Sequence, residues 1–180
     1  AVEIEEADLI LYNTCSVRDH AEQKVFGRMG HFRRLKEMNP NLVIGILGCM
    51  AQEHGQKFFK KNPEIDLVCG PGNLNQVPAL VDEILAKRLP AGRQAGGILA
   101  TDRLNEEYGL DGIQYRSDKI KALVNIMTGC DHRCTYCIVP YTRGDEQSRH
   151  SESVLREMKD LALRWYKDVM LLRQNVNSYG

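Results

Sequence analysis

Three cysteines, Cys130, Cys134 and Cys137, are the residues of this 180-residue chain best suited to chemistry. Their spacing is C-x-x-x-C-x-x-C, and an aromatic residue, Tyr136, directly precedes the last of them. Three thiolates in one short loop can each bind one iron of a 4Fe–4S cube. The sequence offers no fourth cysteine nearby, so the fourth iron would stay open to another molecule. We interpret this segment as a candidate iron–sulfur loop.

Other uses of the same cysteines fit less well. A zinc knuckle could add His132, but this histidine lies between the cysteines, only two residues before Cys134, and would need awkward loop geometry. A bacterial ferredoxin has C-x-x-C-x-x-C with a further cysteine before a proline. A disulfide scaffold is disfavoured because six cysteines are spread over 180 residues without a secretory segment. Zinc remains the alternative to iron–sulfur, and the motif needs its structural context.

A second set of cysteines lies in the first half of the chain. Cys15 and Cys49 each follow an apolar run and precede a helical pattern. In a parallel sheet both would lie on the carboxyl rim, where open α/β folds bind ligands. Cys69 ends a third apolar run, so geometry alone would allow a three-cysteine cluster. The alternative is that each is a small buried hydrophobe, which is the commonest role of a free cysteine.

The composition is that of an ordinary globular protein. The chain has 24 basic and 24 acidic residues, and 43% of its residues are hydrophobic. No segment approaches the ~18 consecutive apolar residues of a membrane span, and no signal peptide is present. Reduced cysteines and an iron–sulfur loop predict a cytoplasmic protein. A net charge of zero gives no electrostatic footprint for nucleic acid over the chain as a whole.

The hydrophobic pattern predicts an α/β fold. In residues 1–89, helices alternate with apolar strands, and we expect the strands at 8–13, 42–47 and 65–68. Continuous helices are expected from 16 to 39 and from about 51 to 61. Apolar strands that alternate with amphipathic helices are typical of a parallel sheet covered on both faces.

The second half of the chain has a different organisation. Residues 90–118 are rich in glycine and small polar residues, which predicts a linker. Residues 119–180 show a strand at 121–128, a helix at 151–166 and a strand at 168–172. A strand whose carboxyl end carries the chemistry, followed by a helix, is how a (β/α) barrel begins. Because one β-α-β unit leaves strand edges and an apolar face uncovered, we expect this chain to be a fragment.

Five motifs together resemble a known family. They are the runs NTCSVR at 13–18, GCMAQ at 48–52, the cysteine loop with its IVPYTRG extension at 129–144, SR at 148–149 and QNVNSYG at 174–180. In this order they resemble the radical methylthiotransferases and are most similar to the branch that acts on tRNA. The resemblance covers nearly the whole chain apart from the linker. It implies an α/β methylthiotransferase domain followed by the start of a radical S-adenosylmethionine barrel.

The resemblance implies a transferase that adds a methylthio group to the adenine ring of isopentenylated adenosine next to the anticodon. A deoxyadenosyl radical made from S-adenosylmethionine would remove hydrogen from the ring, and a sulfur carried at an auxiliary cluster would replace it. The alternatives are the branches that modify a ribosomal protein or threonylcarbamoyl-adenosine. From another class, the alternative is a zinc-stabilised RNA-binding module without catalysis. We expect the fragment alone to be inactive.

The resemblance also implies the site residues. Two 4Fe–4S clusters are expected, one on Cys130, Cys134 and Cys137 and the other on Cys15 and Cys49. The family places a third auxiliary ligand before Cys15 and has an aliphatic residue at Cys69, which therefore becomes a packing residue. We expect contacts to S-adenosylmethionine from three residues, Tyr136, Gln174 and Asn175.

The implied partners are a tRNA substrate, an electron donor and a sulfur donor of unknown identity, and a monomer is expected. A small RNA-binding β domain would follow the barrel. Arginines that could contact phosphate or carboxylate are Arg18, Arg143 and Arg149, although such an arginine is more often solvated or ion-paired. Trp165 and Arg173 stand where similar sequences usually have a small residue or glycine. Arg173 directly precedes the Gln174–Asn175 pair expected at the cofactor.

Overall fold

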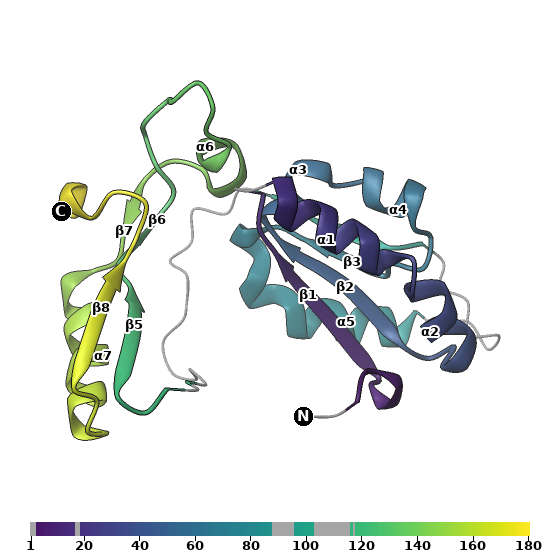
Figure 1. Cartoon of the computed structure of the whole chain (residues 1–180), viewed down its shortest axis with the longest axis horizontal. Coiled ribbons are helices and arrows are strands. Elements are labelled where there is room, and N and C mark those ends of the chain that lie inside the picture. Colours follow the sequence, from purple (N-terminus) through teal and green to yellow (C-terminus); the bar gives the residue numbers. More distant parts are fainter. Residues whose placement is uncertain (1–2, 17–18, 88–95, 103–115, 117) are drawn as a thin grey trace. The chain divides into compact units, whose positions relative to one another are not determined.

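The computed structural model describes residues 3–16, 19–87, 96–102, 116 and 118–180. The chain divides into two compact units, Ala1–Asn105 (unit 1) and Glu106–Gly180 (unit 2), and each is described by itself (Figure 1). Among the described residues, no helix is both long enough and apolar enough to span a membrane.

Unit 1 contains a four-stranded parallel sheet, which confirms the predicted α/β fold. The strand order is β1-β2-β3-β4, and the strands are β1 (Leu9–Thr14), β2 (Val43–Gly48), β3 (Leu67–Cys69) and β4 (Ile98–Ala100). All six residues of β2 are buried, because this strand lies between two neighbours and under helices on both faces. The runs of apolar residues read from the sequence are therefore the strands of a doubly covered sheet.

Helices cover the two faces of this sheet. The elements of unit 1 other than strands are η1 (Ile4–Glu6), α1 (Asp19–Met29), α2 (Phe32–Met38), α3 (Cys49–His54), α4 (Lys57–Lys61), η2 (Pro71–Gln76) and α5 (Val77–Ala86). Phe32 of α2 and Phe58 of α4 pack with Ile44 and Ile46 in one core. Ile84 of α5 packs in the other core, and Figure 1 shows α5 on the opposite face from α1 and α3.

Two helices that the sequence predicts as continuous are each divided in the structure. The first is interrupted between Met29 and Phe32, and residues 17–18 at its expected start lie outside the described residues. The second is interrupted at Gly55, whose φ of 44° does not belong to a right-handed helix. The spacing of apolar residues looks continuous across each break because both pieces of the helix pack against the same core.

The prediction that residues 90–118 are a linker is wrong for residues 98–100. Residues 98–100 form β4, which pairs with β3 in parallel register and brings Ala100 into the core. This strand has only three residues and follows two glycines, so its sequence resembles a loop. The remaining residues of the expected linker lie mostly outside the described residues.

A buried acid ties the sheet to α2. Asp66, directly before β3, accepts hydrogen bonds from Nζ of Lys36 (2.7 Å to each carboxylate oxygen) and from the backbone N–H of Ile44 (2.7 Å). Its side chain is almost completely buried. This carboxylate therefore helps to set the position of β2 between its neighbours.

Unit 2 is built on one β-α-β element. Parallel strands β5 (Lys121–Asn125) and β8 (Asp168–Leu172) are joined through α7 (Ser151–Leu163), and Val124 packs with Val154 and Leu161 of the helix. The expected strand at 121–128 is two strands, because β6 (Met127–Thr128) turns away to pair antiparallel with β7 (Gln147–Ser148). The remaining elements are α6 (Val139–Arg143) and η3 (Val176–Ser178). β7 and α6 are too short to give a periodic signal.

The end of α7 has an unusual residue at its cap. The N–H of Trp165 bonds to the carbonyl of Ala162 (3.1 Å), and the N–H of Tyr166 bonds to the carbonyl of Leu161 (3.1 Å). This is a Schellman motif, in which the residue at the position of Trp165 is left-handed and usually glycine. Trp165 has a φ of 66°, and its ring is 77% exposed with Nζ of Lys167 5.2 Å from the ring centroid. The tryptophan flagged from the sequence thus occupies a strained backbone position.

Candidate metal centres

The three-cysteine loop begins at a glycine that no other residue could replace without movement. Gly129 follows β6 with a φ of 71°, and a Cβ built there would lie 1.9 Å from the carbonyl oxygen of Asp145. The next residue, Cys130, donates its N–H to the carbonyl of Gly144 (3.2 Å) and is only 8% exposed. The two ends of the loop therefore lie against each other, at the carboxyl side of β5 and β6.

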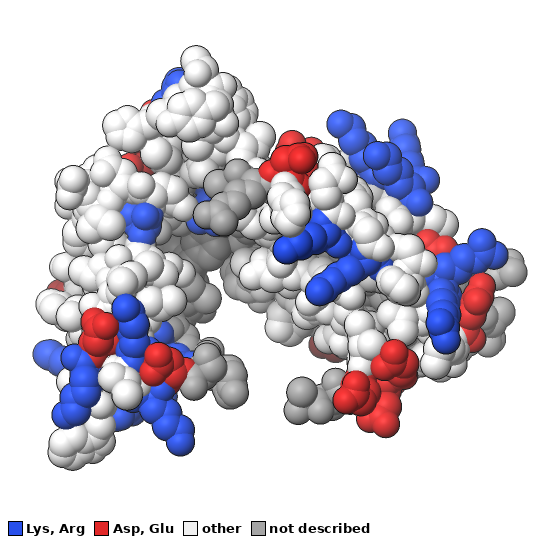
Figure 2. Space-filling view, in the orientation of Figure 1, with Lys and Arg blue, Asp and Glu red and all other residues white. Residues whose placement is uncertain are grey.

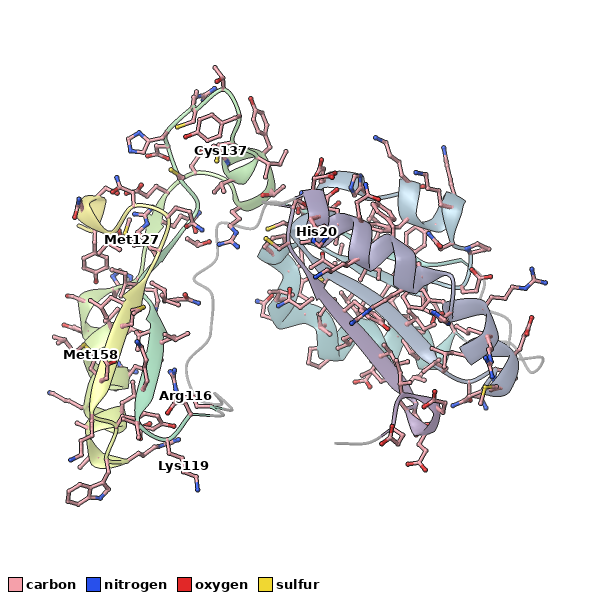
Figure 3. The ribbon with its side chains drawn as sticks, in the orientation of Figure 1. His20, Arg116, Lys119, Met127, Cys137 and Met158 are labelled. Carbon is pink, nitrogen blue, oxygen red and sulfur yellow. The ribbon has the colours of Figure 1, made fainter. Side chains whose placement is uncertain are left out.

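The other two cysteines lie further out on the same loop. Cys137 donates its N–H to the carbonyl of Cys134 (3.0 Å), so these residues form a turn. Cys134 is exposed and Cys137 is half-buried. Figure 3 shows Cys137 in the part of the loop that leads into α6. One buried and two accessible thiols on a single loop can hold a cluster that keeps one side open.

A shared zinc ion would require the three thiols to lie close together. Thiolates that share one tetrahedral zinc lie about 3.8 Å apart, from a Zn–S bond of ~2.3 Å. In the described part of the chain, Cys130, Cys134 and Cys137 are not among the groups whose ligand atoms all lie within 4.8 Å of one another. In a 4Fe–4S cube each thiolate binds a different iron, so the sulfurs stand further apart. Three cysteines on one loop are a donor set that a 4Fe–4S cluster can use, and the thiols are not gathered around a single point as one zinc ion would require.

His132 also makes a contact unrelated to zinc. Its Nε2 lies 3.2 Å from Nδ2 of Asn175, which follows β8. The structure therefore brings Asn175, one of the residues expected to contact S-adenosylmethionine, to the cysteine loop. The two other expected cofactor residues are exposed, Tyr136 by 90% and Gln174 also at the surface.

Arg173, at the end of β8, contacts both ends of the cysteine loop. Its Nη2 donates to the carbonyl of Gly129 (3.1 Å) and to Oε2 of Glu146 (2.8 Å), while Nη1 donates to Oγ of Ser178 (3.0 Å). The hydrogen bond from Arg173, followed by one involving Ser178, lowers the pKa of the Glu146 carboxyl below its ordinary value. Sequence reasoning flagged Arg173 but missed Glu146, since nothing local to Glu146 predicts a partner 27 residues away.

Cys15 and Cys49 lie side by side on the carboxyl rim of the sheet in unit 1. Each directly follows one member of the register pair Thr14 and Gly48, the last residues of β1 and β2. The hydroxyl of Thr14 also donates to the carbonyl of Leu47 (2.6 Å). Cys49 is 3% exposed, whereas Cys15 is exposed. The two strands therefore present two thiols at equivalent positions.

Gly48 permits this close approach of the two strand ends. Its φ is 90°, and a Cβ would lie 2.6 Å from the carbonyl oxygen of Thr14 and 2.8 Å from Oδ1 of Asn13. A side chain at this position would push the start of α3, and with it Cys49, away from β1. The glycine directly before the second cysteine is thus a steric requirement of the rim.

Cys69 lies in the core under α5, where the sequence places it as a packing residue. It has no exposed surface, and it packs with Leu67, Ile84 and Ala100. Burial raises the pKa of its thiol to about 11. The side chain therefore remains an uncharged thiol at neutral pH and does not share the exposure of Cys15.

The arginines named from the sequence have different surroundings. Arg149 is paired with Glu157 (2.7 Å) and donates to the carbonyl of Asn125 (2.7 Å), which is the ion-paired alternative. Arg143 is half-buried in the last turn of α6, and Arg18 lies outside the described residues. On the face drawn in Figure 2, basic side chains gather over α4, which carries exposed Lys57, Lys60 and Lys61.

Sequence reasoning also missed a cluster between α1 and α3. Ligand atoms of Glu22, Glu53 and His54 lie within 4.8 Å of one another. Nε2 of His54 is 3.4 Å from Oε2 of Glu22, and its ring packs against Phe26 and Phe58. A polar contact between His54 and Glu22, supported by aromatic packing of the His54 ring, accounts for this arrangement.

Two family matches fall on the two cysteine sets. Residues 1–70, which contain Cys15 and Cys49, match the family described as "Uncharacterized protein family UPF0004". Residues 124–179, which contain the three-cysteine loop, match the "Radical SAM superfamily". The two matched regions follow each other in the same order as the five motifs, with the UPF0004 region first and the radical SAM region second. The chain belongs to the radical SAM methylthiotransferase family.

Curated relatives of this chain carry the same printed name, tRNA-2-methylthio-N(6)-dimethylallyladenosine synthase. The protein from Clostridium perfringens (strain SM101) is 44% identical over 180 residues, which are 98% of this chain and 38% of the relative. Those from Bacillus licheniformis and Bacillus subtilis are 43% and 42% identical, over 98% of this chain and 34% of each relative. The chain thus spans about a third of the length of these relatives.

Proposed function

We propose that this chain supplies the two cluster sites of an enzyme that adds a methylthio group to isopentenylated adenosine in tRNA. The observation that carries the proposal is the joint presence of a two-cysteine rim in unit 1 and a three-cysteine loop in unit 2. Two separate sets of thiols suit a reaction that needs both a radical and a sulfur carrier. The relatives' printed name adds the tRNA substrate.

In the radical site, Cys130, Cys134 and Cys137 would hold a 4Fe–4S cluster through three irons. When bound, this cluster supplies one electron to S-adenosylmethionine and so provides the radical that removes hydrogen from the adenine ring. The chain's own residues orient it. Gly129 brings the loop to its closing contact with Gly144, and the 8% exposed Cys130 keeps water from one side of the site.

Asn175 is the best placed of the proposed contacts to S-adenosylmethionine. It follows β8 and lies beside His132 of the cysteine loop, so its amide sits next to the candidate cluster site. Gln174 and Tyr136 are exposed and would be covered when the cofactor binds. An amide can accept from the amino group and donate to the carboxylate of the methionine part of the cofactor.

In unit 1, Cys15 and Cys49 would hold the auxiliary cluster with a third ligand from outside these 180 residues. Their positions on adjacent strands let one cluster span both thiols, while the core position of Cys69 keeps it out of the ligand set. We propose that the sulfur to be transferred is carried here. A sulfur donor and an electron donor complete the reaction, which we place in the cytosol because thiols stay reduced there.

The test compares two cysteine variants of the complete gene product that carries these residues. After anaerobic reconstitution with iron and sulfide, the Cys134→Ala variant should lose cleavage of S-adenosylmethionine to deoxyadenosine. The Cys49→Ala variant should keep this cleavage but yield no methylthio product on isopentenylated tRNA. Cleavage that is undiminished in Cys134→Ala would contradict the radical site, and zinc without iron would favour the RNA-binding module. Methylthiolation of a protein in place of tRNA would move the chain to the ribosomal-protein branch.

A further inference from the structure

The side chain of Arg173 is completely buried although it is charged. A buried guanidinium is costly unless its donors are paired. Three of its contacts are described above, with Gly129, Glu146 and Ser178. Its Nε, however, is buried without a hydrogen-bond partner among the described residues. The chain keeps an expensive side chain here, which calls for a role that an apolar residue could not fill.

The partners of Arg173 lie on either side of the cysteine loop. Gly129 directly precedes Cys130, and Glu146 lies at the exit of the loop, directly before β7. The backbone N–H of Glu146 also donates to Oδ1 of Asp131 (2.7 Å), the residue directly after Cys130. The guanidinium of Arg173 therefore connects the entry of the loop, at Gly129, to its exit, at Glu146. The side chain of Asp131 makes a second connection between the same two ends.

The same side chain reaches the segment expected to contact the cofactor. Arg173 belongs to the stretch that leads from β8 to Gln174 and Asn175, and its bond to Ser178 holds η3 against this stretch. Asn175 in turn touches His132 of the cysteine loop. A displacement of Arg173 would thus move the buried ligand Cys130 and the loop around Asn175 relative to each other.

We propose that Arg173, through its pair with Glu146, is a positioning residue for the three-cysteine cluster. It holds the backbone around Cys130 in the geometry that binds iron. It also fixes the position of the segment around Asn175 relative to this loop. This inference rests on the proposed function, because it assumes that the loop holds a cluster. Partners of this kind, which orient the ligands without touching the metal, typically change metal retention by 10–100-fold when removed.

The test uses Arg173→Met, with Arg116→Met as the matched control. Arg116 also pairs with a carboxylate, Glu157 (2.6 Å), donates to a backbone carbonyl, that of Leu123 (2.7 Å), and has a side chain only 14% exposed. Neither of its partners belongs to the cysteine loop. A general loss of stability in unit 2 would therefore affect both variants, whereas a positioning role would affect only Arg173→Met.

The first measurement is made without metal. In the apo form of the complete gene product, Arg173→Met should raise hydrogen exchange at the N–H groups of Cys130 and Glu146 by about 10-fold relative to Arg116→Met. These are the amides that bond across the loop entry and exit. Equal exchange in the two variants would contradict the inference. This measurement does not depend on whether the loop binds iron, so it separates the inference from the proposed function.

The second measurement follows the reconstituted cluster. Iron should leave Arg173→Met about 10-fold faster than wild type in the presence of a chelator, and the electron paramagnetic resonance spectrum of the reduced cluster should change its g-values on addition of S-adenosylmethionine less than in wild type. Arg116→Met should match wild type in both. Identical spectra and rates for all three proteins would overturn the inference, and a wild type without iron would overturn the proposed function.

A conservative variant guards against a simple failure to fold. Arg173→Lys keeps the charge opposite Glu146 but cannot bond to Gly129, Glu146 and Ser178 at once. It should fold, and its rate of iron loss should lie between those of wild type and Arg173→Met. A rate in Arg173→Lys as slow as in wild type would show that the charge alone suffices and would contradict the positioning of the loop by the guanidinium.

Discussion

The two units place their cysteines by different means. In unit 1, the backbone register of two parallel strands brings Cys15 and Cys49 to equivalent positions on the rim, where Gly48 permits the close approach and the Thr14 hydroxyl donates to the carbonyl of Leu47. In unit 2, the three cysteines lie in a loop outside the strands, so strand pairing does not fix their positions. The loop is held by a glycine at its entry and by the side chains of Arg173 and Asp131. A strand ladder positions ligands by many weak repeated contacts, whereas a loop depends on a few strong ones.

The two units also differ in how completely they are packed. The sheet in unit 1 has cores on both faces, with Phe32 and Ile84 fully buried on opposite sides. The two-stranded sheet in unit 2 is covered by α7 on one face, and Leu123 and Met170 remain exposed on its strands. We therefore expect the fold of unit 1 to withstand single substitutions at its rim, and the fold of unit 2 to respond strongly to single changes near its loop.

The largest effect is expected from breaking the ion pair between Asp66 and Lys36 in unit 1. Asp66→Ala removes the partner of Lys36 and the acceptor of the Ile44 N–H, so the free energy of unfolding should fall by about 3–5 kcal/mol. Chemical denaturation of the apo protein measures this. Asp66→Asn, which keeps an acceptor for Ile44, should lose less. Equal losses in the two variants would mean that the charge alone matters.

A somewhat smaller effect is expected at the entry of the cysteine loop. Gly129→Ala combines a left-handed φ with a collision against the carbonyl of Asp145, so it should destabilise unit 2 by about 2–4 kcal/mol and weaken iron retention. Gly144→Ala is the control, because its φ is also positive (77°) but a Cβ there meets nothing within 4 Å. It should cost only the ~1–3 kcal/mol of a backbone conformation that favours glycine. If the two variants lose the same stability, steric contact at Gly129 is unimportant.

A weak effect is expected at Cys69. Cys69→Val nearly conserves volume, so the free energy of unfolding at pH 7 should change by less than ~1.5 kcal/mol. The raised pKa of this thiol, about 11, predicts a pH dependence. The stability that the neutral thiol contributes is complete below the unfolded pKa, ordinarily ~8.5, and is lost as pH rises toward the folded value.

This pH dependence can be measured directly. Between pH 8 and pH 11 the wild type should lose stability relative to Cys69→Val, by up to about 1.4 kcal/mol for each unit by which the two pKa values differ. Titration of unfolding free energies over this range checks it. Parallel pH profiles for the two proteins would show that Cys69 ionises as easily in the folded chain as in the unfolded one.

The smallest effect is a stabilisation at the end of α7. Trp165→Gly removes the strain of a left-handed tryptophan, and it should raise the free energy of unfolding by ~0.5–1 kcal/mol after loss of the exposed Lys167 contact. Trp165→Ala, which keeps a Cβ at the same φ, should not show this gain. A thermal midpoint that is higher in Trp165→Ala than in Trp165→Gly would refute the assignment of strain.

Much of the fold could be predicted because the strands of unit 1 begin with or consist of continuous runs of apolar residues. The strands at 8–13 and 42–47 agree with β1 and β2 to within one residue. The central strand β2 is buried along its whole length and therefore apolar, whereas β1 begins with an apolar run although it is only partly buried. The short elements could not be predicted. β4 and β7 have three and two residues, and each exists only because a neighbouring strand offers a partner.

The candidate site also has a part that the sequence predicts and a part that it does not. The ligand cysteines could be named from spacing and from the ends of apolar runs, and Cys69 could be assigned to packing. The network of Arg173 with Glu146 and Ser178 could not, because its members are far apart in sequence and meet only in the folded loop. Which residues bind iron is still a prediction.

The most direct measurement counts iron and sulfide in matched cysteine variants of the complete gene product. After anaerobic reconstitution, Cys134→Ala and Cys49→Ala should each lose about four irons and four sulfides, because each removes a ligand of a different 4Fe–4S cluster. Cys69→Val should lose none. The spectrum of the cluster that remains should differ between the first two variants, since it belongs to unit 1 in one and to unit 2 in the other. Full iron content in Cys134→Ala, or a loss of four irons in Cys69→Val, would contradict the assignment of two clusters to these two sets of cysteines.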